Sequence, residues 1–181
     1  MLKKIIIGLV LAIVAYFAYG VLTTRKHSPF TTAKGSIEDL TVAVDYCQPY
    51  KKGRLIFGEE SQDALVPFGK YWRLGANEAT EISFSQDVNF AGNKVKAGRY
   101  RMYAVPNKSE WEISLNSELG EFGYFEPDYS LDILKVNIPS RPNPNMLEQF
   151  TMAFTSDSTS LLLNMGWDTT MISIPISKQE D

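Results

Sequence analysis

From Ser36 onward the chain alternates apolar and polar residues, and this pattern constrains the fold more than any other feature of the sequence. A period of two is typical of half-buried β-strands, because successive side chains of a strand point to opposite faces. Gly, Pro, Asn and Asp separate the alternating runs, as expected of turns. The apolar positions are Val42, Val44 and Tyr46; Ile82 and Phe84; Trp111, Ile113 and Leu115; Leu134, Val136 and Ile138; Phe150, Met152 and Phe154; Leu161, Leu163 and Met165; and Ile172, Ile174 and Ile176.

A β-hairpin is predicted in the middle of the chain. Val88–Phe90 and Lys94–Lys96 flank the turn residues Ala91-Gly92-Asn93. A further strand is expected over Arg99–Val105, and it stops at Pro106 because proline has no backbone N–H to donate.

Outside the N-terminal segment the sequence predicts little helix. Gly58–Leu65 and Asn145–Gln149 each have room for one short turn, and Pro139–Pro144 is expected to be a loop between strands. Many short strands without helices between them indicate antiparallel sheets. We therefore predict an all-β fold, an antiparallel two-sheet β-sandwich of about eight to ten strands preceded by one N-terminal transmembrane helix.

The N-terminal segment Ile5–Leu22 is apolar and contains no charged residue. Its length is close to the ~20 residues that a helix needs to span a bilayer. Two interpretations stay open, a retained signal anchor and a signal peptide cleaved after the small residues of Ala18-Tyr19-Gly20. The apolar run is longer than a typical signal-peptide core, which favours the anchor.

The orientation of this helix follows from its flanks. Lys3 and Lys4 precede it and Arg25 and Lys26 follow it, so the positive charges are nearly balanced. The segment before the helix is too short to be a domain, so we expect a cytoplasmic N-terminus and an extracytoplasmic domain, in the periplasm or at the cell surface; the alternative is secretion after cleavage. The expected segments are 1–26 as the anchor, 27–35 as a tether, 36–177 as the β-sandwich domain and 178–181 as a C-terminal tail.

Charge and composition exclude several functions. All 21 acidic residues lie after residue 26, while four of the 18 basic residues precede it, so the body has 14 basic residues and a net charge of −7. This argues against a nucleic-acid partner. Cys47 is the single cysteine and His27 the single histidine, which removes an intrachain disulfide, a histidine-based triad and a multi-histidine metal site. We expect no metal and no cofactor.

Two loops rich in charged and turn residues, 47–58 and 67–80, form the candidate site. Consecutive irregular loops often lie at the same end of a sandwich, so Arg54, Lys70 and Arg73 are expected to face one pocket, with Glu78 as their counter-charge. Arginine presents a planar fork of donors that suits anionic groups. The six predicted ligand-binding residues are Arg54, Lys70, Trp72, Arg73, Asn77 and Glu78.

Each of these residues also has a structural interpretation. Arg73 and Glu78 would form an ion pair that fixes the loop, Asn77 would be a turn residue, and Trp72 would belong to the core. Cys47 is expected to be a small buried residue, because no histidine can activate it.

The same two loops resemble the bacterial family called domain of unknown function 2911. The resemblance rests on Tyr46, Pro49, the runs 52–54, 56–58 and 65–70, the run WRLGANEAT over 72–80, Ala97-Gly98-Arg99-Tyr100 and Trp111, and it extends over about 36–176. Gln48 stands where the family usually has arginine, and Leu74 where it often has threonine. The resemblance implies one exported domain and brings no activity with it.

The expected function is therefore a binding module for an unknown small molecule, glycan or protein partner, attached to the membrane through Ile5–Leu22. Two alternatives stay open. The first is a carboxylate-dependent hydrolase that acts, for example, on glycans with Glu78 as the weak catalytic candidate. The second is a structural protein of the envelope that contacts other proteins through its sheet edges.

Overall fold

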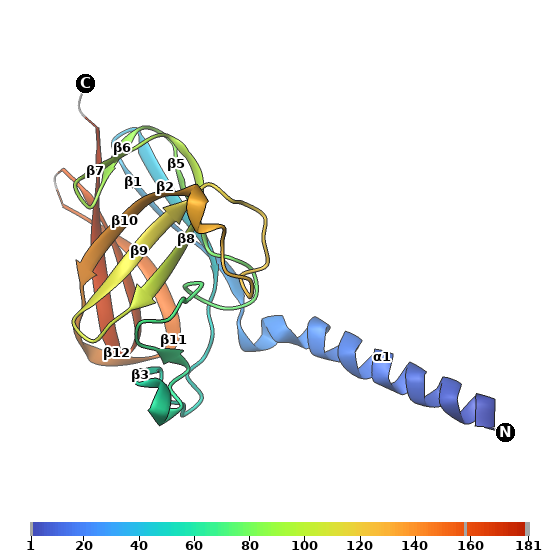
Figure 1. Cartoon of the computed structure of the whole chain (residues 1–181). Coiled ribbons are helices and arrows are strands. Elements are labelled where there is room, and N and C mark those ends of the chain that lie inside the picture. Colours follow the sequence, from blue (N-terminus) through green and yellow to red (C-terminus); the bar gives the residue numbers. More distant parts are fainter. Residues whose placement is uncertain (1, 158, 180–181) are drawn as a thin grey trace.

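The computed structural model describes residues 2–157 and 159–179. A long N-terminal helix, α1 (Leu2–His27), projects from a β-rich body (Figure 1). Residues Ile6–His27 of α1 are long and apolar enough to cross a membrane; the most apolar 18-residue window has a mean hydropathy of 2.3, and none of its described residues is buried. The last turn of α1 is basic, with Arg25, Lys26 and His27.

The larger sheet of the body has six antiparallel strands. Its strand order is β1-β2-β5-β8-β9-β10. The strands are β1 (Phe30–Ile37), β2 (Leu40–Cys47), β5 (Glu81–Phe84), β8 (Gly98–Pro106), β9 (Glu110–Asn116) and β10 (Asp132–Pro139).

The smaller sheet has four antiparallel strands in the order β11-β12-β6-β7. They are β11 (Arg141–Ser156), β12 (Leu161–Lys178), β6 (Val88–Phe90) and β7 (Asn93–Val95). Two short strands, β3 (Phe57–Gly58) and β4 (Val66–Pro67), form a separate parallel pair, and the 3-10 turn η1 (Glu60–Gln62) lies between them in the sequence. A second 3-10 turn, η2 (Tyr129–Leu131), precedes β10.

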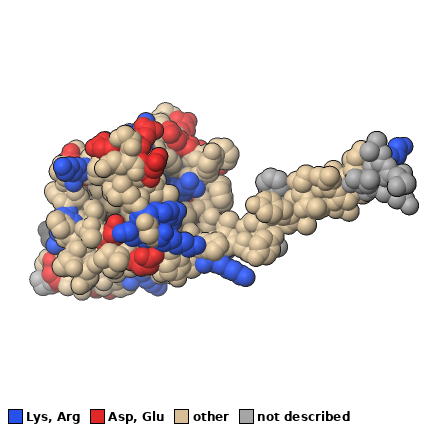
Figure 2. All heavy atoms as spheres, turned by 90° about the horizontal axis from the view of Figure 1, so that it is seen from below, with Lys and Arg blue, Asp and Glu red and all other residues tan. Residues whose placement is uncertain are grey.

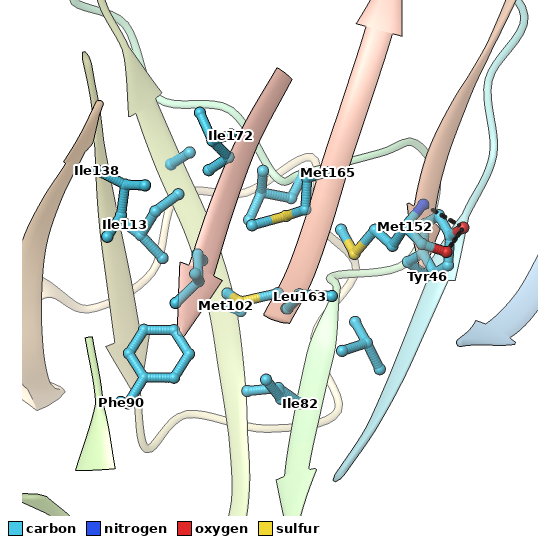
Figure 3. Packing of buried hydrophobic residues seen from close by; sticks show 14 of the residues in the cluster. Tyr46, Ile82, Phe90, Met102, Ile113, Ile138, Met152, Leu163, Met165 and Ile172 are labelled. Carbon is cyan, nitrogen blue, oxygen red and sulfur yellow. Dashed lines mark hydrogen bonds between the residues drawn. The ribbon is translucent and has the colours of Figure 1, made fainter. Parts of the chain in front are cut away.

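The two large sheets enclose the hydrophobic core in a sandwich-like arrangement. Side chains from both sheets, such as Ile82 and Met102 from one and Leu163 and Ile172 from the other, are fully buried between them (Figure 3). Alternate residues of β2 follow the period of two, because its apolar residues face this core and its polar residues do not.

Tyr46 joins the two sheets at one end of the core. Its hydroxyl accepts a hydrogen bond from the backbone N–H of Met152 at 2.8 Å, so a residue of β2 is bonded to β11 (Figure 3). Gln48 Nε2 also donates to this hydroxyl, at 2.9 Å. Burial raises the pKa of Tyr46, so the ring stays neutral in this network.

The all-β antiparallel fold and the N-terminal apolar helix that the sequence predicts are confirmed. The predicted hairpin is formed by β6 and β7, which pair through Val88↔Val95. The turn within Gly58–Leu65 is η1.

Three local expectations differ from the structure. Residues Asn145–Gln149 and most of Pro139–Pro144 belong to the long strand β11 rather than to a turn and a loop. Irregular pairing with β12 between Pro142 and Thr151 accommodates the prolines, since an irregular register tolerates a missing N–H. The third difference concerns residues 27–35, which were expected to be a tether. In the structure α1 continues to His27 and β1 begins at Phe30.

β1 is an edge strand with one exposed face, and its polar sequence FTTAKGSI therefore has few apolar residues to mark it. At the other end of the chain, the expected tail begins with Lys178, the last residue of β12, and residues 180–181 lie outside the described residues.

Candidate functional site

A pocket of about 540 Å³ opens where the body meets the end of α1. His27 and Ser28 contribute to its wall. The rest comes from the two loops that the sequence singles out, from Leu65 and Val66 between these loops, and from Trp167 of β12. This volume lies within the range of about 300–1,000 Å³ that is typical of small-molecule sites. Seen from below, Lys and Arg side chains gather on the face beside the base of the helix (Figure 2).

The pocket has an aromatic floor made of two tryptophans. Trp72 and Trp167 lie in a stacked arrangement, with ring centroids 6.1 Å apart and planes inclined by 19°. Trp72 also packs edge-on against Phe150 at 4.9 Å. Backbone hydrogen bonds in both directions between Trp72 and Ala104 hold the loop against β8, at 2.8 and 2.9 Å. Trp72 is therefore a core residue and a pocket residue at once.

Three cationic side chains line this pocket: Lys52, Arg54 and Arg73. Arg54 is held by its own loop, because its Nε donates to the carbonyl of Lys51 at 2.9 Å and its Nη2 to that of Tyr50 at 2.5 Å. Lys52 Nζ lies 2.8 Å from His27 Nδ1, so this lysine connects the pocket to the last residue of α1.

Arg73 differs from the other two cations. It is half-buried, and its guanidinium stands 5.8 Å from the centroid of the Tyr124 ring. No hydrogen bond or ion pair joins this guanidinium to another residue among those that the structure describes. Burial lowers the pKa of Arg73, because removal from water disfavours the charged form. An anionic group placed beside this half-buried guanidinium would stabilise its charged form.

The backbone of residues 74–77 brings Asn77 to the pocket wall. Leu74 and Asn77 have left-handed φ angles of 54° and 58°. Gly75 has a φ of 146°, and a Cβ at this position would stand 2.6 Å from the carbonyl oxygen of Cys47. Glycine is therefore required here by both conformation and space. Asn77 Nδ2 donates to Cys47 Sγ at 3.8 Å, so the side chain is partly engaged in its own loop.

Glu78 stands beside the pocket and does not contribute to its lining. It forms an ion pair with Arg25 of α1 and accepts a hydrogen bond from Cys47 Sγ at 3.2 Å. Burial raises the pKa of Glu78, but hydrogen bonds from its own backbone N–H and from Cys47, together with Arg25, outweigh this and hold the pKa below its usual value. Burial, with the neighbouring Glu78, raises the pKa of Cys47 to about 11, so the thiol is protonated at neutral pH.

Lys70 lies away from the pocket. Its backbone N–H closes a turn onto Pro67 at 3.4 Å, and its exposed ammonium forms an ion pair with Glu60 of η1 at 3.4 Å. The structure therefore brings Arg54, Trp72, Arg73 and Asn77 together, with Glu78 adjacent and Lys70 outside.

Sequence reasoning missed several residues around the pocket. Trp167 and His27 reach it from β12 and from the end of α1, far from the two loops in the sequence. The scarcity of tryptophan and histidine was a possible signal, with three and one in the whole chain.

Sequence reasoning also missed Arg101 of β8, a positively charged residue in the protein interior. Only 1% of it is exposed, and its Nη1 donates to Glu118 at 2.8 Å. Its Nη2 donates to the Tyr71 hydroxyl at 2.8 Å and to the Phe125 carbonyl at 2.5 Å. Arg101 therefore fixes residues 117–131, which we call the β9–β10 loop, against β8. This loop also supplies Tyr124 to Arg73.

Within residues 2–157 and 159–179, no three His, Cys, Asp or Glu side chains are grouped as a metal site. The pocket lining contains cations, aromatic rings and an amide, which suits an anionic organic ligand rather than a metal ion.

Fold and site define an all-β sandwich with an apolar N-terminal helix and a cationic pocket at the junction of the two. The chain belongs to the family described as "Protein of unknown function (DUF2911)", whose match covers residues 28–176. That match begins directly after α1 and includes every pocket residue except His27. The search of curated proteins gave no significant match, and neither did the search of solved structures.

Proposed function

We propose that this protein is a membrane-anchored, extracytoplasmic binding module whose pocket takes a small anionic ligand with a flat, partly apolar face. One observation carries the proposal: Lys52, Arg54 and Arg73 line a pocket above the Trp72–Trp167 floor, and no carboxylate lines it among the described residues.

The local charge of the pocket supports an anionic ligand. The body has a net charge of −7, so a group of three cations without a lining carboxylate departs from the general surface. Arg73 offers a guanidinium whose donors are not engaged by other described residues, and a carboxylate or phosphate oxygen matches its planar fork. The indole floor suits a sugar ring or another flat surface.

The position of the pocket supports the membrane part of the proposal. α1 is long and apolar enough to span a bilayer, and none of the described residues in its apolar window is buried. Its basic last turn, Arg25 to His27, marks the level of lipid headgroups at the domain end of the helix. The domain then lies outside the cytoplasm if the short N-terminus stays inside.

A hydrolase that uses Glu78 has less support from the geometry. Glycoside hydrolysis of the common type needs two carboxyl groups on either side of the scissile bond. Glu78 is engaged by Arg25 and Cys47, and its low pKa makes it a poor proton donor at neutral pH. A purely structural role does not explain why the Arg73 guanidinium has a ring contact but no hydrogen bond or ion pair among the described residues.

The proposal is tested by thermal unfolding of the full chain in detergent micelles with glucose 6-phosphate, glucuronate or inorganic phosphate, and with neutral glucose as the reference. A ligand at 100 times its Kd stabilises the folded state by about 2.7 kcal/mol. We expect at least one anion, and not glucose, to raise Tm, and we expect Arg73→Ala to remove this effect.

Lys70→Ala is the matched control, because Lys70 is an exposed cation outside the pocket lining. It should keep the response to the anion. Equal loss in both variants would indicate general charge attraction and contradict the proposal, as would an unchanged Tm with all three anions.

A further inference from the structure

The β9–β10 loop exposes an unusual group of large apolar side chains. Phe122, Tyr124 and Phe125 at its tip are 51%, 70% and 64% exposed. Leu119, Tyr129 and Leu131 extend the group along the same loop. Single exposed apolar residues are common on protein surfaces, but a contiguous group indicates an interaction site.

This loop is connected to the base of α1. Phe122 forms an isolated β-bridge with Glu78, and Glu78 in turn pairs with Arg25 in the last turn of α1. In Figure 1 the loop between β9 and β10 hangs on the side of the sandwich from which α1 leaves. The exposed aromatic tip and the end of the apolar helix therefore lie on the same side of the body.

The tip is held in shape by buried contacts rather than left loose. Arg101 bonds the Phe125 carbonyl, and the Tyr71 hydroxyl donates to the Gly123 carbonyl at 3.2 Å. Gly123 also donates its N–H to the Asn77 carbonyl at 3.0 Å. A Cβ on Gly123 would stand 2.9 Å from Arg73 Cδ, so glycine is what allows this close approach. The backbone groups of the tip form hydrogen bonds with the body, while the rings of Phe122, Tyr124 and Phe125 are exposed.

We propose that Phe122, Tyr124 and Phe125 lie in the interfacial layer of the bilayer and give the domain a second membrane contact beside α1. The inference rests on the membrane anchoring in the proposed function. Tyrosine favours the headgroup region because its ring is apolar and its hydroxyl is polar. Phenylalanine belongs to the apolar side of interfacial segments, which enters the boundary between headgroups and acyl chains.

The charge of the loop identifies the kind of lipid surface. The sequence SELGEFGYFEPDYSL, residues 117–131, contains no Lys or Arg. Its acidic groups are mostly engaged within the fold: Glu118 pairs with Arg101, and Glu126 accepts from the Tyr129 hydroxyl at 2.6 Å. Attraction to anionic lipid is therefore not the driving force, and a zwitterionic surface is the expected partner.

The consequence is an oriented domain. One helix alone leaves a domain free to rotate about its tether, whereas two contacts on one side fix which face meets the lipid. Tyr124 belongs to the aromatic tip and its ring also contacts Arg73, so the pocket would lie at the level of the headgroups.

Fluorescence quenching tests this inference on the full chain in phosphatidylcholine nanodiscs, with and without dibrominated acyl chains. Phe125→Trp is the reporter, and Phe122→Trp is a second reporter in case the first disturbs the fold. The three native tryptophans, Trp72, Trp111 and Trp167, are at most 6% exposed, so they give a background that bromine does not reach. Lys94→Trp, in the exposed part of β7 away from α1, is the matched control (Figure 1).

Val14→Trp, in the middle of α1, reports separately on whether the anchor is inserted. We expect quenching of the reporters at 125 and 122 and at 14, and none at 94. Quenching at 14 without quenching at 125 and 122 would overturn the second contact and leave the anchor standing. Equal quenching at 94 and 125 would also overturn it, since the domain would have no preferred face. Failure to quench at 14 would contradict the anchor and, with it, this inference.

Discussion

Arg101 and Arg73 lie in neighbouring parts of the molecule and have opposite environments. Arg101 is buried in β8 and donates to a carboxylate, a hydroxyl and a carbonyl. Arg73 lines the pocket and has a ring contact with Tyr124 but no hydrogen-bond acceptor among the described residues. This contrast indicates that Arg101 maintains the fold, and it supports the proposal that Arg73 binds a ligand.

The physical reason for this division is the cost of burying charge. A buried cation is tolerated only where hydrogen bonds and an opposite charge replace its hydration, as around Arg101. Arg73 is half-buried in the pocket wall, and in the proposed function an anion would replace the water at its guanidinium. Substitutions of these two residues should therefore affect different measurements, and the following predictions test this.

Removal of Arg101 should have the largest effect on stability. Arg101→Met removes the ion pair with Glu118 and the donor to the Phe125 carbonyl, and it should lower the free energy of unfolding by about 3 kcal/mol. Urea unfolding of the full chain in micelles measures this. If Arg101→Met lost no more stability than Arg73→Ala, the division between the two arginines would be wrong.

Gly75→Ala should have the next largest effect, because it alters the pocket wall without changing any charge. The alanine would hold a φ that L residues rarely adopt and would press on the Cys47 carbonyl, at a cost of about 2 kcal/mol. Thermal unfolding measures the loss, with Gly53→Ala as the control, since Gly53 has a positive φ but open space around its Cβ position. Equal losses would show that the close contact with Cys47 has no weight of its own.

Arg73→Ala should change binding more than stability. We expect the free energy of unfolding to fall by less than about 1 kcal/mol. Affinity for a stabilising anion should fall at least tenfold, which corresponds to about 1.4 kcal/mol. Unfolding experiments measure the change in stability and ligand titrations measure the change in affinity. A loss of stability as large as that of Arg101→Met would mean that Arg73 mainly maintains the fold.

Glu78 should have the smallest and most pH-dependent effect. Its pKa is lowered in the folded state, so its carboxylate stabilises the fold above the ordinary value of about 4.5, and this contribution is lost as the pH falls through the lower folded pKa. Glu78→Gln should thus be less stable than the native chain at pH 7, by under about 1 kcal/mol for a surface pair. Urea unfolding at pH 7 and at lower pH should show this difference in stability narrowing as the pH falls below 4.5, and a difference that widens on acidification would contradict the assigned direction.

Much of the fold was accessible from the sequence because several core strands alternate apolar and polar residues over most of their length. Val42 and Val44 face the core while Thr41 and Ala43 face away, and the same regularity marks Ile172 and Ile174. β1 was not predicted, because an edge strand buries few side chains and shows little alternation. The first part of β11 was predicted as a loop because it contains two prolines.

The site was only partly accessible for a different reason. Sequence proximity placed Arg54, Trp72, Arg73 and Asn77 in two adjacent loops, and these do share one pocket. It could not separate Lys70 from them, because a single turn after Pro67 directs that lysine toward Glu60.

Long-range contacts were not predictable from local pattern at all. Trp167 completes the floor from β12. Arg25 takes the partner role at Glu78 that the sequence had given to Arg73, and this pairing depends on how the helix end meets the body.

If Arg73 and the indole floor form one anion-binding pocket, indole NMR of the full chain should detect the bound anion. With ¹⁵N-labelled tryptophan, the resonances of Trp72 and Trp167 should shift saturably on titration with glucose 6-phosphate, glucuronate or phosphate, and the shifts should disappear in Arg73→Ala but persist in Lys70→Ala. No saturable shift with any of the three anions, or unchanged shifts in Arg73→Ala, would contradict the account.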